Sequence, residues 1–361
     1  MSWIKKKFVS FSIIIFSCLI GVTVIEIGLR LVKSTDQWVV TEEANILRNF
    51  QFSYDISNLY PTDVSVTDYV RNEYGLRDDC ENPDDIEILT IGGSTTDQRY
   101  VPFEFTYQTV LQQRLRAAES NFGCVSNAGV DGHSSWGHLF AFDKWFPLIS
   151  DLNPKFILLY VGVNDANFLR TDSPNAGFDT NTSGDFKRYL KGFHVVRALL
   201  PIYRLPRQRS ENASAAYAGH APRPYEYSDY TVTVMNEETR RLTTENAAAF
   251  KSRMSAILNE IRMLNAIPIC VTQPHRYVIT KEDGQTYGIP SVLGDGFSGL
   301  DYDFSIQQLN SVLFELCGVN TVDLYSHNFL NSHFYDGVHT TSLGSQEIGE
   351  TLADFIISRF Y

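Results

Sequence analysis

Ile86-Glu87-Ile88-Leu89-Thr90-Ile91-Gly92-Gly93-Ser94 is the stretch that decides the fold. Its first six residues form a short, mostly apolar run of the length typical of a buried strand. The two glycines that follow permit a sharp turn, because glycine adopts backbone angles that other residues avoid. The stretch therefore predicts a strand that turns into a helix, with Ser94 at the turn, where backbone amides point toward developing negative charge.

The same pattern recurs at four more places along the chain. Short apolar runs occur at residues 124–126, 156–161, 267–272 and 319–324. Stretches with helical spacing lie between such runs, for example residues 107–118 and 237–264. Strands that alternate with helices predict a parallel sheet, whose strand ends share one edge where ligands bind.

Polar blocks follow these runs and fit one kind of chemistry. The blocks are Gly92–Thr96, Asn127–Gly129, Gly162–Asp165 and Asp336–His339. A serine in a glycine turn supplies a nucleophile, and an Asp and a His three residues apart supply a base and its orienting partner. Glycine and asparagine supply hydrogen-bond donors for an oxyanion. If the sheet forms as predicted, the blocks meet at one edge and compose an acyl-transfer site.

With these blocks in this order, the chain resembles the SGNH hydrolases, also called GDSL esterases and lipases, over about residues 85–361. The resemblance implies a flavodoxin-like three-layer α/β/α sandwich with a five-stranded parallel sheet in the order 2-1-3-4-5. It implies a catalytic triad and an oxyanion hole made of Ser94, Asp336 and His339, and of the Ser94 amide, Gly129 and Asn164. One departure is visible, because Gly92–Thr95 reads Gly-Gly-Ser-Thr where the family motif reads Gly-Asp-Ser-Leu, which removes the acidic neighbour.

Ordinary structural or binding roles are alternatives for several of these residues. Ser94 could cap a helix, or its glycine turn could hold a phosphate, but the presence of all four blocks disfavours both. Asn164 could be an ordinary turn residue. Asp165 is expected to bind backbone amides, and His333 is a rival to His339 as the base.

Two more histidines are candidate substrate-binding residues. His133 follows the second block in a loop that also holds His138, and His275 lies in Gln273–Arg276 after the fourth run. Both loops are expected to border the cleft, although an ordinary loop is an equal alternative for the second. The spacing of His133 and His138 does not favour zinc, so no metal and no cofactor are predicted.

The N-terminus predicts a membrane anchor. Lys5–Lys7 precede the uncharged run of residues 8–25, which as a helix would cross roughly 27 Å of hydrocarbon. The basic cluster predicts a single-pass protein with a cytoplasmic N-terminus and an extracytoplasmic catalytic domain. A cleaved signal peptide is the main alternative, but no small-x-small site is present. Ile15–Cys18 only faintly resembles a lipobox.

The chain is expected to divide into three parts. Residues 1–34 form the cytoplasmic tip and anchor, and residues 35–84 form a polar segment, called the lead segment below. The lead segment contains a predicted turn at Asn72–Arg77. Residues 85–361 form the hydrolase domain, with an insertion at about 170–235 that is either a lid or a surface loop.

The cysteines outside the apolar run lie in a compartment expected to be oxidising. Cys80 and Cys124 stand near the starts of neighbouring strands, and we expect them to form a disulfide. Cys270 and Cys317 could pair, or could remain buried thiols.

Composition narrows the function further. The formal net charge of −12 argues against a nucleic-acid partner, and 43% hydrophobic residues suffice for one large core. The sequence as a whole predicts a serine esterase that cleaves an acetylated glycan, a lipid or a small ester through an acyl-enzyme on Ser94. An O-acyltransferase that acylates a sugar hydroxyl is the first alternative, and a non-catalytic glycan-binding module on the same fold is the second.

Overall fold

The computed structural model describes residues 44–167, 225–292 and 297–361, together with scattered residues between 13 and 41. The chain forms two compact units, and the larger one comprises residues 41–180 and 217–361. This larger unit carries the sheet. The smaller unit consists of residues 1–40 and 181–216, most of which lie outside the described residues.

A five-stranded parallel sheet forms the centre of the larger unit. In chain order its strands are β3 (Ile86–Gly92), β4 (Cys124–Asn127), β5 (Phe156–Tyr160), β6 (Ile267–Val271) and β9 (Thr321–Val322). They lie side by side in the order β4-β3-β5-β6-β9, and all neighbours are parallel. The predicted sheet and its strand order are confirmed. The last strand, β9, is much shorter than the predicted run of residues 319–324, and a 3₁₀ turn at Gly318–Asn320 occupies the start of that run.

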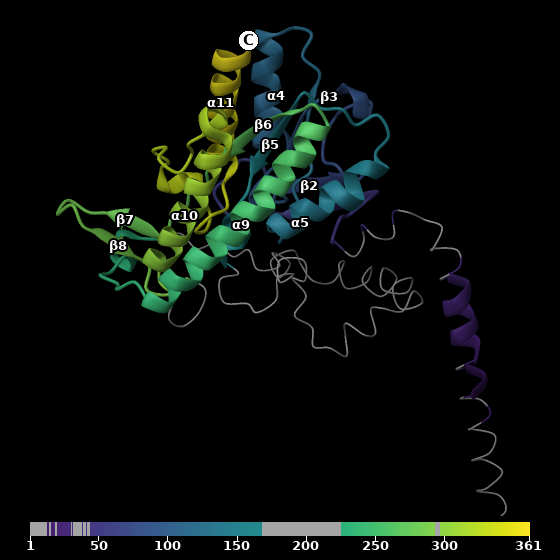
Figure 1. The fold of residues 1–361 in the computed structure, drawn as a ribbon, viewed down its shortest axis with the longest axis horizontal. Helices are drawn as coiled ribbons and strands as arrows, with labels where there is room; N and C mark the ends of the chain where they lie inside the picture. Colours follow the sequence, from purple (N-terminus) through teal and green to yellow (C-terminus); the bar gives the residue numbers. More distant parts are fainter. Residues whose placement is uncertain are drawn as a thin grey trace, which may run out of the picture. The chain divides into compact units, whose positions relative to one another are not determined.

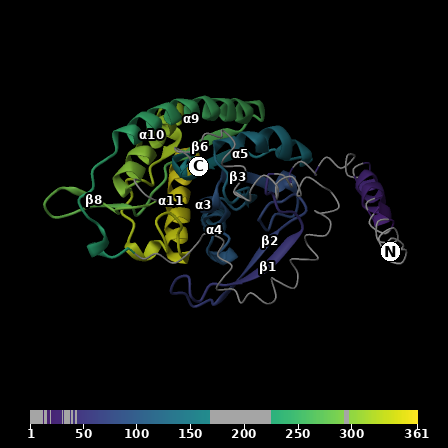
Figure 2. The same cartoon turned by 90° about the horizontal axis from the view of Figure 1, so that it is seen from below.

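Helices cover both faces of this sheet, as the two views show (Figures 1 and 2). Among the described residues of the larger unit, the five longer helices are α4 (Tyr107–Ala118), α5 (Ser135–Phe140), α9 (Glu237–Met263), α10 (Gly299–Cys317) and α11 (Ser342–Phe360). The pair α4 and α11 packs on one face, and α9 with α10 packs on the other. Gly349 permits the close contact of α11 with α4, since a Cβ there would lie 2.7 Å from the Cβ of Val110.

The core between the sheet and the α4–α11 pair is apolar. Ile88, Phe156 and Leu158 of the sheet are fully buried there, together with Leu111 of α4 and Ile348 of α11. Burial of such side chains stabilises a fold by about 1.5 to 3 kcal/mol each. The core holds the strand ends in fixed positions, and the polar blocks follow those ends.

Shorter elements complete the structure. They include the helices α3 (Ser94–Asp97) and α6 (Val163–Asn167) and the antiparallel pairs β1 (Phe50–Asp55) with β2 (Val66–Arg71) and β7 (Val278–Thr280) with β8 (Thr286–Gly288). Single 3₁₀ turns occupy Pro83–Asp85, Phe103–Phe105, Phe146–Leu148, Tyr227–Asp229 and Asn331–His333, and a π turn occupies Ala141–Trp145.

The lead segment forms structure that its polar composition does not predict. Its β1 and β2 pair over six positions, and the expected turn follows, in which the Asn72 side chain accepts the N–H groups of Tyr74 and Leu76. Gly75 takes a φ of +82°, which favours glycine. The Arg77 N–H then bonds to the Asn127 carbonyl at 3.0 Å. The lead segment therefore joins the edge of the sheet at β4.

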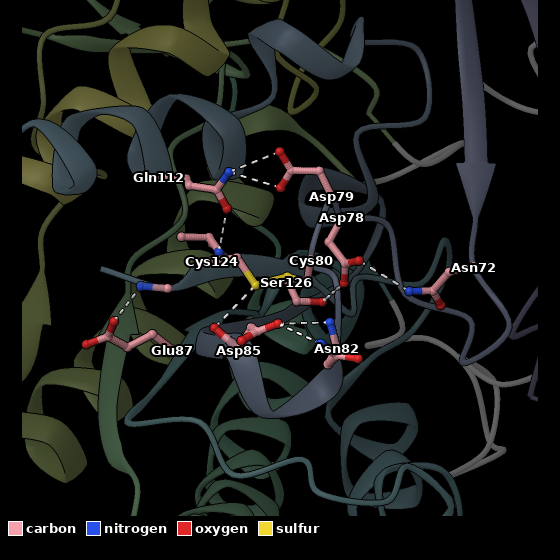
Figure 3. The surroundings of a disulfide bond; sticks show 12 residues. Asn72, Asp78, Asp79, Cys80, Asn82, Asp85, Glu87, Gln112, Cys124 and Ser126 are labelled. Carbon is pink, nitrogen blue, oxygen red and sulfur yellow. Dashed lines mark hydrogen bonds between the residues drawn. A yellow bond between two sulfur atoms is a disulfide. The ribbon is translucent and has the colours of Figure 1, made fainter. Parts of the chain in front are cut away.

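The structure joins Cys80 to Cys124 and Cys270 to Cys317 in two disulfides, with Cα–Cα distances of 5.8 and 6.1 Å. Figure 3 shows the first of them. There the Gln112 side chain bonds to the carboxylate of Asp79 on the lead segment, and it also accepts the Val125 N–H of β4. The first disulfide thus ties the lead segment to the first residue of β4.

Two predicted segments are described only in part. The anchor at residues 8–25 is described only at residues 13, 16–18 and 20–25, and the insertion at about 170–235 only from residue 225 onward. Among the described residues, no helix has both the length and the hydropathy that a membrane crossing requires.

Candidate active site

Ser94, His339 and Asp336 form a continuous hydrogen-bonded chain. The Ser94 Oγ lies 2.7 Å from the His339 Nε2, and the His339 Nδ1 lies 2.7 Å from an Asp336 carboxylate oxygen. The carboxylate can only accept, so the Nδ1 carries the proton and the Nε2 is left to accept from the serine hydroxyl. This is the arrangement in which an imidazole can remove a serine proton.

Asp336 is held mainly by its own loop. Its second carboxylate oxygen accepts the N–H of Val338 at 2.9 Å and the N–H of His339 at 2.7 Å. Gly337, which follows Asp336, lies against the Tyr277 ring, and a Cβ there would lie 2.0 Å from a ring carbon. The Tyr335 ring stacks on the His339 imidazole with centroids 5.6 Å apart. These contacts fix the spacing of carboxylate and imidazole.

The pKa values of the pair move in opposite directions. Burial alone would lower the pKa of His339, but the Asp336 carboxylate outweighs burial and raises it above its usual value. Burial alone would raise the pKa of Asp336, but His339 and the two backbone N–H groups outweigh burial and lower it. The carboxylate therefore stays ionised at neutral pH and favours the imidazolium that forms when the serine proton is removed.

The turn before Ser94 requires both glycines for reasons of space. A Cβ on Gly92 would lie 2.4 Å from the Tyr160 carbonyl oxygen, and one on Gly93 would lie 2.6 Å from the Asn164 amide nitrogen. The helix predicted to follow the serine is a single turn, α3, which ends at Asp97 and is followed by Gln98 with a φ of +48°. The main helix, α4, starts only at Tyr107. The helix dipole therefore contributes little at Ser94.

Asn164 lies beside the serine turn. Its amide nitrogen donates one hydrogen to the His133 carbonyl at 2.9 Å and contacts Gly93. A primary amide carries two N–H groups, so this bond holds the side chain and leaves a second donor for a ligand. Asp165 next to it is buried and bonds to both the N–H and the hydroxyl of Ser135. Asp165 therefore accepts a backbone N–H, as expected from the sequence.

Gly129 is placed differently from its predicted role. Its N–H donates to the Asn127 side-chain oxygen at 2.8 Å, so this donor is already used. Its Cα presses on the backbone of Thr96 and Asp97, where a Cβ would lie 2.4 Å from the Asp97 nitrogen. Gly129 thus packs the loop after β4 against the serine turn and does not offer its N–H to a ligand.

The glycine three residues later was not considered from the sequence. Gly132 has a φ of +81°, and its N–H bonds to no acceptor within the described part of the chain. It follows Asp131, which lines the cleft beside Ser94. The signal that could have pointed to it is its place in Asp131-Gly132-His133, where a second glycine follows the strand end.

His133 has a structural position, which corrects its prediction as a substrate-binding residue. Its side chain is buried, and its Nε2 bonds to the Ala44 carbonyl at 2.6 Å. Burial lowers its pKa to about 4, so the ring is neutral at physiological pH. His138 is also buried, and burial lowers its pKa as well. The imidazole of His133 fastens the lead segment to the loop after β4.

His275 is likewise held within the protein, contrary to its predicted role. Its Nδ1 accepts the Tyr277 N–H at 3.2 Å and its Nε2 donates to Asp303 at 3.0 Å, and the side chain is 1% exposed. Both nitrogens are therefore used. The rival base His333 ends a 3₁₀ turn, and burial lowers its pKa, but it is His339 that contacts Ser94.

One cleft contains the Ser94–His339 pair, and a second is lined by Asp336, with Tyr335 in the wall of both. The first contains Ser94 and His339 together with Asp131 and Arg99. The second is an open groove of about 910 Å³, including its mouth. It is lined by residues of four regions, among them Leu59, Tyr60, Tyr225, Arg276, Phe334 and Leu343. Arg276 comes from the loop that was expected to border the cleft.

Metal ligands do not gather near these clefts. Within residues 44–167, 225–292 and 297–361, and the scattered residues before them, no group of three or more His, Cys, Asp or Glu side chains could hold a metal ion. What the arrangement offers is a serine hydroxyl, a base and an amide donor, which suits acyl transfer.

Comparison with known proteins identifies the family. The sequence model of the family described as GDSL-like Lipase/Acylhydrolase matches residues 88–352, which is most of the chain. Among curated proteins, none matches the chain.

Several solved structures are similar at low sequence identity. One is an acetyl xylan esterase, AlAXEase, with 14% identity, 74% of this chain and 98% of that chain covered, and a TM-score of 0.41. Another is a lipase from a goat rumen metagenome, with 12% identity, coverage of 76% and 100%, and a TM-score of 0.45. A third is a catalytic mutant of an acetylxylan esterase from Geobacillus stearothermophilus, with 12% identity, coverage of 74% and 93%, and a TM-score of 0.40. At these TM-scores the likeness supports no statement about substrate.

Proposed function

The chain belongs to the GDSL-like lipase/acylhydrolase family of serine ester hydrolases, and from this premise we propose that Ser94 is the nucleophile that forms its acyl-enzyme. The observation that supports this most is the 2.7 Å contact between the Ser94 Oγ and the His339 Nε2. His339 is the base, and Asp336 orients and stabilises its imidazolium.

In the proposed reaction, the His339 Nε2 takes the hydroxyl proton while the Ser94 Oγ attacks the ester carbonyl. The tetrahedral intermediate collapses when the imidazolium gives that proton to the leaving alkoxide, which departs as an alcohol. A water molecule, deprotonated by the same imidazole, then attacks the acyl-enzyme. The carboxylic acid leaves and the serine is restored.

The charge on the carbonyl oxygen needs donors next to Ser94. We propose the Ser94 N–H and the second N–H of the Asn164 amide, whose position the bond to His133 fixes. On hydrogen bonding, the Gly132 N–H is a better third candidate than the Gly129 N–H, because Asn127 already accepts the latter.

A fluorophosphonate probe tests the nucleophile directly. It should label the wild-type protein and fail to label Ser94→Ala, and peptide mapping should place the label on Ser94. Labelling of Ser94→Ala at the wild-type rate would contradict the assignment. A binding module on this fold would not be labelled at all.

The acyl-enzyme is common to hydrolysis and to transfer, so product analysis must separate the two. We propose hydrolysis, since water needs no site of its own. A panel of acetyl, short-chain and long-chain esters, each with and without sugar acceptors, identifies the acyl group. Formation of an acylated sugar at the expense of free acid would favour the transferase instead.

We further propose that residues 8–25 anchor the protein in a membrane, with the catalytic unit outside the cytoplasm. The support is the basic cluster Lys5–Lys7 followed by an uncharged run, and two disulfides of the kind that persist in oxidising compartments. Protease added to intact spheroplasts should digest the catalytic unit. Protection until the membrane is lysed would reverse the proposed topology.

A further inference from the structure

We propose that Arg71 of the lead segment is a positioning residue of the active site, which holds the serine turn and the loop after β4 in their relative places. The inference rests on the proposed function of Ser94. It makes the lead segment a part of the catalytic machinery, although this segment lies outside residues 88–352, which match the family model.

Arg71 is buried, and its guanidinium is fully engaged with three parts of the chain. The Nε donates to the Tyr69 hydroxyl at 2.7 Å. The two terminal nitrogens donate to the Gly75 carbonyl at 2.9 Å, the Asn127 carbonyl at 3.2 Å, the Gly129 carbonyl and the Asp97 carboxylate. A planar group with five N–H donors in a fixed fork can make such a set of bonds, whereas a lysine ammonium cannot.

Asp97 is the point where this network reaches the serine turn. It is the last residue of α3, which begins at Ser94, and it is 1% exposed. Its carboxylate accepts from Arg71, from the Tyr69 hydroxyl at 2.6 Å and from Arg99 at 3.1 Å. Burial would raise its pKa, but the two arginines outweigh burial and lower it. The ionised carboxylate holds the end of the one-turn helix.

The opposite side of Arg71 holds the loop after β4. The Asn127 and Gly129 carbonyls both accept from it, and Gly129 packs directly on the backbone of Thr96 and Asp97. Asn127 adds a second link, because its amide donates to the Thr96 carbonyl at 2.8 Å. One guanidinium therefore binds both loops where they contact each other, and it fixes the distance between Ser94 and the donors of the neighbouring loop.

The network explains how the turn is held without the acidic residue of the family motif. Gly93 stands where that residue would be, and Asp97 supplies a carboxylate four positions later. Its partners Tyr69 and Arg71 both lie on β2, whose pairing with β1 sets their place. Small displacements of a reacting group are costly, and a shift of about 1 Å can lower a rate about 10²-fold. Loss of the Arg71 hydrogen bonds should therefore lower kcat and leave substrate binding largely unchanged.

The test compares Arg71→Lys and Tyr69→Phe with Arg114→Lys in the full-length protein. Arg114 is the matched control, since it pairs with Asp354 at 3.0 Å on the surface, where it is half exposed. We expect Arg71→Lys to lower kcat for a p-nitrophenyl ester by about 10- to 100-fold with KM within about twofold. Tyr69→Phe should lower kcat in the same direction by less, and Arg114→Lys should match wild type.

Fluorophosphonate labelling provides a second readout, because its rate depends on the serine and not on the ester. The labelling rate of Arg71→Lys should fall along with kcat. If Arg71→Lys keeps wild-type kcat and loses only thermal stability, Arg71 is merely structural and the inference is wrong. If that variant does not fold, Tyr69→Phe decides, and wild-type kcat in it also overturns the inference. Wild-type activity of Ser94→Ala would instead refute the proposed function itself.

Discussion

The two sides of the active site differ in how far their own loops define them. On the base side, Asp336 and His339 lie in one loop, and both the carboxylate–imidazole bond and the bonds from Asp336 to two backbone N–H groups form within four residues. On the donor side, Asn164 is held by the carbonyl of a distant loop, and the Gly129 N–H is taken by Asn127. Residues within one loop set their own hydrogen-bond geometry. Whether a donor from a separate loop is available to a ligand depends on which acceptors of other segments pack beside it.

The largest effect is expected from the substitution of Ser94, because the base and the oxyanion donors both act on its reaction. Ser94→Ala removes the nucleophile, and ester hydrolysis should fall by roughly 10⁶-fold, to the level that binding and the oxyanion donors alone provide. Steady-state hydrolysis of a p-nitrophenyl ester measures it, after circular dichroism shows that the variant is folded. Turnover near the wild-type rate would mean that neither side of this site serves catalysis.

Asp336→Asn tests the base side alone and should lower kcat by about 10⁴-fold, because the imidazole loses its orientation and its counter-charge. The pH profile sharpens the test. His339 must be neutral to act as a base, and Asp336 raises its pKa, so wild-type kcat/KM should fall with decreasing pH already above the usual histidine range. In the variant this acid limb should move to lower pH. An unchanged limb would show that another group titrates.

Asn164→Ala tests the donor side and should lower kcat by about 10²- to 10³-fold with little change in KM, since its amide is proposed to bind the oxyanion mainly in the transition state. Asn127→Ala is the matched control. It removes the acceptor of the Gly129 N–H and a link to Thr96, so we expect about 1 to 3 kcal/mol less stability in urea unfolding and a smaller loss of kcat. A larger loss of kcat in Asn127→Ala than in Asn164→Ala would contradict the assignment of Asn164 as the oxyanion donor.

The smallest effect on activity is expected from the disulfide that ties the lead segment to β4. Cys80→Ser with Cys124→Ser opens a loop of 44 residues and should lower the free energy of unfolding by about 2 to 4 kcal/mol, with kcat at 25 °C nearly unchanged. Chemical denaturation measures the change, and Cys18→Ser, which removes a free and exposed cysteine, is the control. Loss of kcat in the folded double variant would assign the disulfide a role at the active site.

Several parts of this structure could be predicted because their signals are short-range. The apolar run at residues 86–91 and its counterparts gave the strands, and their alternation with helical stretches gave a parallel sheet. The three-residue spacing of Asp336 and His339 indicated the histidine that contacts Ser94 in the structure. The β1–β2 pair was missed because β2 inverts the usual pattern of a half-buried strand: it buries Thr67, Tyr69 and Arg71 and exposes its two valines.

The sequence by itself determined the nature of the chemistry in this protein, since a serine turn, an Asp-x-x-His loop and strand-end glycines specify acyl transfer wherever a parallel sheet brings them together. Only the tertiary structure decided which donors remain available. Gly129 and His133 each satisfy a buried neighbour, and Arg71 crosses from the lead segment to bind two loops at once. A buried polar group must find a partner, and the packing of distant segments decides which one it meets.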